Sequence, residues 1–142
     1  SNVGGHFGPL LKFAGFDALE VRGKASEFVV VVIDGDERRV TIETAPHEAL
    51  NSYDVARQLH DMYARTPGEL QSLSVVSAGE GAVHTRIGCL NVSFYDWKRR
   101  EPRLKQAGRG GLGTVLMDKK IKAIVAKSSH NRPQWTLSVE AP

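Results

Sequence analysis

The pattern of apolar and polar positions predicts a strand pair near the start of the chain. Residues 28–33 read FVVVVI, a β-branched run typical of a strand buried on both faces. Asp34-Gly35 separates this run from a second one, 39–43, whose apolar and polar positions alternate. Asp-Gly between two such runs is a strong hairpin signal, so we expect the two strands to be antiparallel neighbours.

A helical period replaces the strand pattern over 52–65. Val55, Leu59 and Met62 fall on one stripe of this segment, and Pro67-Gly68 ends it. The side chain of Asn51 or Ser52 is the expected N-terminal cap.

The remaining predicted elements are short. They are helices over 9–14 and 112–119, and strands over 17–22, 73–76, 83–90 and 121–125. Several strands with one long helix and two short ones predict an α+β fold with a mixed or antiparallel sheet. Residues 128–142 read as a boundary tail, in which Trp135 and Leu137 are expected to dock on a neighbouring surface.

Composition places the chain among soluble globular proteins of one domain. Its 142 residues are 41% hydrophobic, but the longest apolar run covers only 28–33, which is too short to cross a membrane. A single cysteine, Cys89, excludes an internal disulfide framework and fits a reducing compartment, so we expect a cytoplasmic location.

Positive charge is concentrated late in the chain. The net charge is +3, and the segment 98–127 holds ten of the nineteen basic residues against only Glu101 and Asp118. Such a segment would attract an anionic partner or, alternatively, form an ordinary solvated surface. Aromatic side chains at Phe94, Tyr95 and Trp97 precede the basic run, so a module that stacks and neutralises single-stranded nucleic acid is a further, less favoured alternative.

The sequence lacks the residue patterns of several kinds of catalytic site. The five histidines, His6, His47, His60, His84 and His130, do not have the spacing common in metal sites. The sequence contains no G-x-S-x-G elbow and no Walker lysine after a glycine loop. We therefore expect this chain to supply no metal ligands and no catalytic residue. His60 is expected to be a partly buried, hydrogen-bonded side chain, and Cys89 a small buried hydrophobic one.

The glycine-rich stretch AGRGGLG, residues 107–113, contains a literal G-x-G-x-x-G. A dinucleotide site would need a buried strand before the glycines, but the preceding run 98–106 is charged and contains Pro102. Backbone N–H groups of glycines, with the guanidinium of Arg109, would suit a phosphate. A plain surface loop with tight turns is the other interpretation that these residues allow.

Two long segments resemble the N-terminal domain of the tungsten-containing aldehyde:ferredoxin oxidoreductase family. The first is SNVGGHFGPLLKFAGFDALEVRGKA (1–25), and the second is KQAGRGGLGTVLMDKKIKAIVAK (105–127). Between them, Ser77-Ala78-Gly79-Glu80 and Cys89-Leu90-Asn91 are similar to a turn and strand of that family. The resemblance implies the family's N-terminal domain fold, with 1–127 as a partial domain.

The resemblance also implies a cofactor site. In this family the domain is the floor beneath a tungsten (or molybdenum) bis-pyranopterin, whose sulfurs hold the metal. If each residue has the role of the matching residue in the family's motif, Asn2, Gly4 and Gly5 would lie against one pterin. The residues expected against phosphate and pterin edges are Ala107, Gly108, Arg109, Gly110, Gly111 and Gly113. AGRGGLG is then a pterin-phosphate cradle.

The resemblance implies that this chain is a fragment, a split subunit or an isolated domain of an oxidoreductase that oxidises aldehydes to carboxylic acids. The cysteine motif for a [4Fe–4S] cluster is not found in this sequence, so catalysis by the chain alone is not expected. Expected partners are the rest of the enzyme or another subunit, and ferredoxin or an electron-transfer subunit. An uncovered sheet edge or apolar face predicts partner binding or self-association.

Residues 94–103, FYDWKRREPR, resemble a branch of the family that includes the tungsten benzoyl-CoA reductases. An aryl-CoA reductase domain is therefore the alternative to the aldehyde oxidoreductase. A noncatalytic remnant that has kept the fold and lost the cofactor is another.

Overall fold

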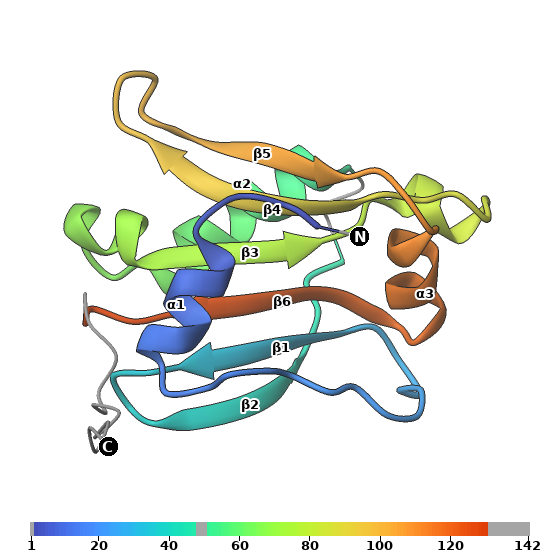
Figure 1. Cartoon of the computed structure of the whole chain (residues 1–142), viewed down its shortest axis with the longest axis horizontal. Coiled ribbons are helices and arrows are strands. Elements are labelled where there is room, and N and C mark those ends of the chain that lie inside the picture. The colour runs from blue at the N-terminus through green and yellow to red at the C-terminus, as the bar shows by residue number, and fades with distance from the viewer. Residues whose placement is uncertain (1, 48–50, 131–142) are drawn as a thin grey trace, which may run out of the picture.

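The computed structural model describes residues 2–47 and 51–130, which form one mixed sheet with helices on both faces (Figure 1). The helical elements are α1 (Phe7–Phe13), α2 (Ser52–Tyr63), α3 (Leu112–Asp118) and the short 3-10 turns η1 (Pro67–Ser72) and η2 (Glu80–Val83). The strands are β1 (Val29–Asp34), β2 (Arg39–Thr44), β3 (Leu73–Ser77), β4 (Leu90–Asp96), β5 (Glu101–Ala107) and β6 (Ile121–Lys127). The predicted α+β class with a mixed sheet is confirmed.

The six strands lie in the order β2-β1-β6-β3-β4-β5, with β2 and β5 at the edges. Only the β1–β6 pair is parallel, and the other pairs are antiparallel. The last of the described strands, β6, therefore lies in the middle of the sheet, between β1 and β3. The β1–β2 pair is the hairpin that Asp34-Gly35 predicts, with Val31 opposite Ile42.

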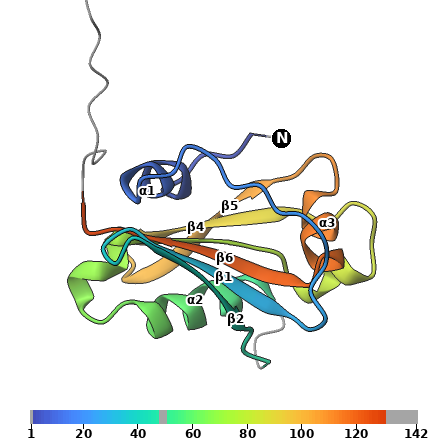
Figure 2. The ribbon, with the colours of Figure 1, turned by 90° about the horizontal axis from the view of Figure 1, so that it is seen from below.

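The two larger apolar cores lie on opposite faces of this sheet. Figure 2 shows α1 on one face and α2 on the other. On one face Val55 and Leu59 of α2 pack against alternate residues of the central strands, including Val75 and Val125. On the other face α1 and the segment that follows it cover Val31, Ile33, Val76 and Ile124. The continuous apolar run of β1 is thus buried from both sides, as its sequence predicts.

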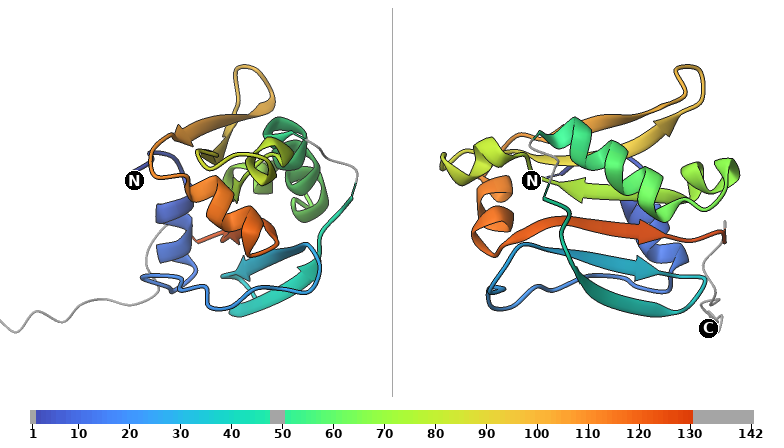
Figure 3. Two further views of the ribbon diagram at one scale, coloured as in Figure 1. Left: turned by 90° about the vertical axis from the view of Figure 1, so that its right-hand side faces the viewer. Right: turned by 180° about the vertical axis from the view of Figure 1, so that it is seen from behind.

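Helix α2 lies in front of the sheet in the right-hand view of Figure 3, and Asn51 caps its N-terminus. The Asn51 side chain accepts hydrogen bonds from the backbone N–H groups of Tyr53 and Asp54, both at 3.0 Å. Val55 and Leu59 of the predicted stripe are buried, but Met62 is 53% exposed. Met62 lies in the last turn of the helix, so the stripe leaves the core before the helix ends.

Three predicted strands differ in the structure. Residues 17–22 are not a strand, and the apolar side chains of Leu19 and Val21 instead line a groove over β1 and β2. Residues 83–90 form the end of η2 and a loop, so the real strand, β4, begins at Leu90. Strand β5 was not predicted, because its run of charges contains Pro102; at a sheet edge both are tolerated.

None of the helices within the described ranges is long and apolar enough to span a membrane. The expected docking of Trp135 and Leu137 lies outside the described residues.

Candidate cofactor site

The N-terminal segment lies over the sheet on the same side as α1, beside the ends of β3 and β4 (Figures 1 and 2). A shallow cavity of about 390 Å³ separates it from the strands. The lining residues are Asn2, Val3, Gly4, Gly5, Phe7, Gly8, Val76, Leu90 and Val92. Strand side chains give the cavity an apolar floor, and the segment 2–5 gives it a wall made largely of backbone.

Gly5 is required where this segment approaches the sheet. Its φ of +131° is a conformation that side chains disfavour, and a Cβ there would lie 3.0 Å from Val92 Cγ1. At Gly4 an added Cβ would lie 3.8 Å from Cδ of Lys105 in β5. The N-terminal segment is therefore in contact with both β4 and β5.

Lys105 lies beside the candidate site, and the sequence analysis did not single it out. Its Nζ lies 5.8 Å from the centre of the Phe94 ring, and the His6 ring packs against the same ring at 5.9 Å. Pairing across β4 and β5 sets Lys105 opposite Val92, so its side chain lies on the α1 face, beside Gly4. The only available signal was the alternation in Arg103-Leu104-Lys105, which is informative only once 101–107 is known to be a strand.

The glycine-rich loop continues from the same end of β5 into α3. Ala107 is buried and pairs with Leu90, which lines the N-terminal cavity. Gly110 (φ +83°) and Gly111 (φ +62°) then turn the chain in the left-handed region. Arg109 is exposed in this turn.

Gly111 and Gly113 have a packing role that their sequence does not reveal. A Cβ at Gly111 would lie 2.3 Å from the carbonyl oxygen of Arg86, and one at Gly113 would lie 2.1 Å from that of Cys89. Gly113 N–H also donates to Gly88 O at 2.9 Å. Thr114 Oγ1 completes the contact by donating to Thr85 O (2.7 Å) and accepting from Gly88 N–H (3.0 Å).

The loop therefore has an open half and a closed half. At Gly108 and Gly110 an added Cβ would meet other atoms no closer than 4.0 Å, whereas Gly111 and Gly113 lie flat against the loop 85–89. Free backbone at 108–110 and the Arg109 guanidinium are suited to an oxyanion. Cys89, expected to be buried, is only half-buried beside Gly108.

The strand topology excludes a dinucleotide turn here. A Rossmann unit needs a parallel strand pair joined through the helix that follows the glycines. In this fold β5 is an edge strand antiparallel to β4, and β6 after α3 pairs with β1 and β3 instead.

The cations of the basic segment have different surroundings in the fold. Several of its side chains are used within the fold: Lys119 donates to Gly23 O, Lys120 to Ser26 O and Lys122 to Pro46 O, while Lys127 is buried between Asp34 and Glu69. At the β4–β5 turn, Arg99 bonds Asp96 (2.8 Å) and holds the pKa of that carboxyl below its usual range. Exposed cations near the site include Lys105 and Arg109.

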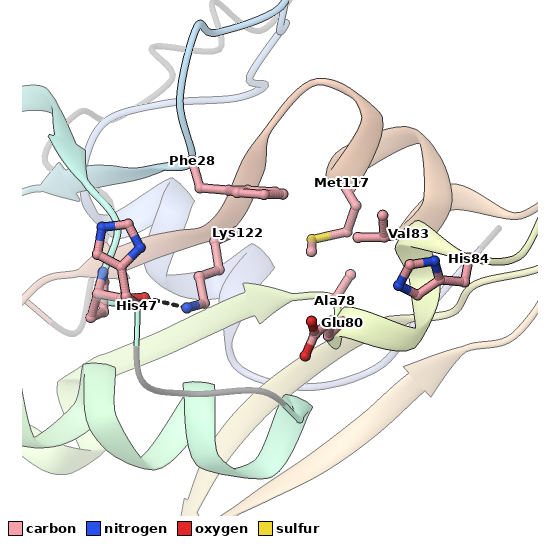
Figure 4. Close-up of a pocket in the computed structure, with 9 residues that line it drawn as sticks. Phe28, His47, Ala78, Glu80, Val83, His84, Met117 and Lys122 are labelled. Atoms are coloured by element: carbon pink, nitrogen blue, oxygen red, sulfur yellow. Dashed lines mark hydrogen bonds between the residues drawn. The ribbon is translucent and has the colours of Figure 1, made fainter.

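A second cavity, of about 300 Å³, lies between η2, α3 and residues 46–47 (Figure 4). Phe28 and Met117 face it, with His47 and His84 on opposite sides and Lys122 between them. It includes none of the residues assigned to the cofactor. Within residues 2–47 and 51–130, no three His, Cys, Asp or Glu side chains are grouped closely enough to hold a metal ion.

Comparison with known proteins identifies the family of this chain. The sequence model of the aldehyde ferredoxin oxidoreductase N-terminal domain matches residues 1–128. The chain belongs to this family. Within the aldehyde ferredoxin oxidoreductase family, it is 32% identical to the tungsten-containing aldehyde ferredoxin oxidoreductase of Pyrococcus furiosus, over 94% of this chain and 20% of that protein. It is 33% identical to the enzyme of the same name from Pyrococcus horikoshii, over 93% of this chain and 19% of the relative.

Among solved structures, the fold is similar to a chain of the active site complex BamBC of benzoyl coenzyme A reductase bound to 1,5-dienoyl-CoA. The TM-score is 0.67 at 28% identity, covering 88% of this chain and 17% of that one. This aldehyde ferredoxin oxidoreductase domain thus spans about a fifth of the length of the curated relatives it matches.

Proposed function

We propose that this domain is the cofactor floor of a tungsten (or molybdenum) bis-pyranopterin oxidoreductase that oxidises aldehydes to carboxylic acids with ferredoxin as electron acceptor. Family membership and the names of the curated relatives support the tungsten enzyme class. Since the chain spans about a fifth of those relatives, substrate binding and the [4Fe–4S] cluster are assigned to the rest of the enzyme.

The observation that supports this proposal is that two glycine-rich segments from distant parts of the sequence, 2–8 and 107–113, lie close together. Gly4 lies against Lys105, and Ala107, two residues further along β5, pairs with a strand residue that lines the N-terminal cavity. Both segments therefore present backbone at the same end of the sheet. A large planar ligand with phosphates needs such a surface, because glycine backbone approaches a ring closely and its N–H groups bind oxyanions.

The residues present fit the pterin cofactor in separate roles. Asn2, Gly4 and Gly5 would lie against one pterin, while Ala107, Gly108, Arg109 and Gly110 would bind phosphate and pterin edges. Gly111 and Gly113 would contribute mainly by letting the loop 85–89 hold the cradle in shape. When bound, the metal pterin would supply the two-electron redox chemistry, and this chain would orient it and neutralise its phosphates.

A second candidate is the equivalent domain of an aryl-CoA reductase. The similarity to the benzoyl coenzyme A reductase complex favours it, as does the β4–β5 hairpin with Trp97 47% exposed beside the basic turn. Reduction of an aryl thioester and oxidation of an aldehyde would both use the same cofactor floor.

The first test is metal and pterin analysis of the native protein with whatever co-purifies. We expect tungsten or molybdenum, iron and pterin phosphorus in the native assembly, and neither metal nor pterin in the 142-residue chain alone. A folded native assembly without tungsten, molybdenum or pterin would support the noncatalytic remnant instead.

Arg109→Ala in the native assembly tests the cradle itself. Loss of a guanidinium at a dianionic phosphate should lower metal and pterin content roughly tenfold at limiting cofactor, since such a contact is worth about 1.5–3 kcal/mol. Arg57→Ala is the matched control, because Arg57 is an exposed arginine on α2, on the other face of the sheet. Equal cofactor content in both variants would contradict the assignment of Arg109.

A further inference from the structure

The two edges of the sheet differ in how they are protected against another strand. Within the described residues, β2 and β5 each pair with a single neighbour, so each has one row of unpaired backbone groups. Such an edge is a template for strand addition unless proline, like charges or a covering element blocks it.

Strand β5 carries two of these protective features. Pro102 removes an N–H donor from the edge. Antiparallel self-pairing about Leu104 would set Arg103 opposite Lys105 of a second copy, and like charges in directly opposite positions repel.

Strand β2 carries neither feature. It has no proline, and Val40 and Ile42 are 44% and 72% exposed. Both side chains lie on the α1 face, since Val40 pairs with Ile33 and Ile42 with Val31. They form one wall of an apolar groove of about 440 Å³, whose opposite wall is formed by Leu19 and Val21.

The sequence of β2, RVTIET, is complementary to itself in one antiparallel register. With Thr41 opposite Thr41 of a second copy, each Val40 faces an Ile42 and each Arg39 faces a Glu43. The apolar pairs then lie on the α1 face and the opposite charges on the α2 face. Cross-strand pairs of both kinds stabilise antiparallel sheets.

We propose that β2 is a homodimer interface. It pairs with β2 of a second copy about a twofold axis that passes between the two Thr41 residues. A shift of the register by one residue would place apolar side chains opposite polar ones and invert one sheet against the other. A shift by two residues would keep the faces aligned but lose both Arg39–Glu43 pairs and all but one apolar pair. The twofold register is thus the one that satisfies both faces, as an isologous interface requires.

The dimer would be a continuous sheet with six strands from each copy. The glycine-rich segments lie by β4 and β5, at the opposite edge, so pairing through β2 leaves the candidate cofactor site open. The inference therefore does not depend on the proposed function.

The test is sedimentation analysis of the 142-residue chain over a range of concentrations. We expect a concentration-dependent dimer. Arg39→Glu and Glu43→Arg should each weaken the dimer about tenfold, because each variant sets like charges opposite one another twice in the symmetric interface. The double variant Arg39→Glu with Glu43→Arg should return the dissociation constant to within about threefold of the original.

Arg103→Glu in β5 is the matched control and should leave the dimer unchanged. Circular dichroism and the melting temperature at low concentration would show that each variant is folded, which matters because Glu43 also accepts a hydrogen bond from Tyr63. A chain that stays monomeric, or a dimer that the single reversals leave intact, would overturn the proposal. A double variant that dimerises as weakly as the single variants would overturn the twofold register.

Discussion

His60 is a histidine that the fold keeps neutral. The side chain is fully buried and its Nε2 is hydrogen-bonded to Ser93 Oγ at 2.9 Å, while Nδ1 has no hydrogen-bond partner among the described residues. Burial lowers the pKa of His60 from 6.5 to about 4. Ser93 Oγ also accepts from the Val75 backbone N–H (2.8 Å), so the imidazole is fixed to the central strands.

This lowered pKa predicts a loss of stability in mild acid. Between pH 6.5 and about 4 the unfolded chain binds a proton at His60 and the folded chain does not, so the free energy of unfolding falls as pH falls through this window. The loss attributable to His60 should approach about 3 kcal/mol at pH 4. Urea unfolding of the parent and His60→Gln at pH 7 and pH 4.5 measures it: the parent should lose more stability than the variant, and equal losses would contradict the assignment.

Gly113 and Gly108 provide a matched pair for the glycine-rich loop. Gly113→Ala would push a methyl group onto the Cys89 carbonyl, 2.1 Å away, and should cost about 3 kcal/mol or more of the free energy of unfolding. Gly108→Ala meets only Cys89 Sγ at 4.0 Å and should change stability by less than about 0.5 kcal/mol. Thermal unfolding of both variants tests this difference, and similar melting temperatures would show that the loop 85–89 is not held as described.

The cap of α2 gives a prediction for a whole element. Asn51→Ala removes the acceptor of two backbone N–H groups and should cost about 1 kcal/mol. Asn51→Ser keeps a side-chain oxygen at the cap and should retain most of the stability. Chemical unfolding of the two variants measures both effects, and an equal loss in Asn51→Ser would show that the side-chain oxygen is not the stabilising group.

Elements with a strong local pattern could be predicted from the sequence. The β1–β2 hairpin and α2 each follow from their own residues: a β-branched run with Asp34-Gly35, and a helical stripe with a cap. Strand β5 could not, because a charged run with a proline becomes a strand only through its pairing with β4. The alternation over 17–22 led to a wrong strand prediction for the converse reason. Leu19 and Val21 are apolar because they lie over β1 and β2, but the segment itself pairs with no described strand.

At the level of the whole molecule, the candidate site was predictable only in part. Both glycine-rich segments were visible in the sequence, and the fold brings them to one end of the sheet. The position of Lys105 beside Gly4 and Phe94 could not be predicted, because only the pairing of β4 with β5 creates it. The basic run 98–127 does not reveal that several of its lysines donate to carbonyls of the same domain, because those contacts depend on the fold.

The central position of β6 has a consequence for how this domain is made on the ribosome. Until residues 121–127 leave the exit tunnel, β1–β2 and β3–β4–β5 are separate units, each with an apolar edge that β6 will later cover. Pairing of β1 with β6 joins residues about ninety positions apart, and such non-local parallel pairing is slow. Nascent chains should therefore remain sensitive to proteases, and dependent on chaperones that bind exposed apolar strands, until β6 has left the exit tunnel.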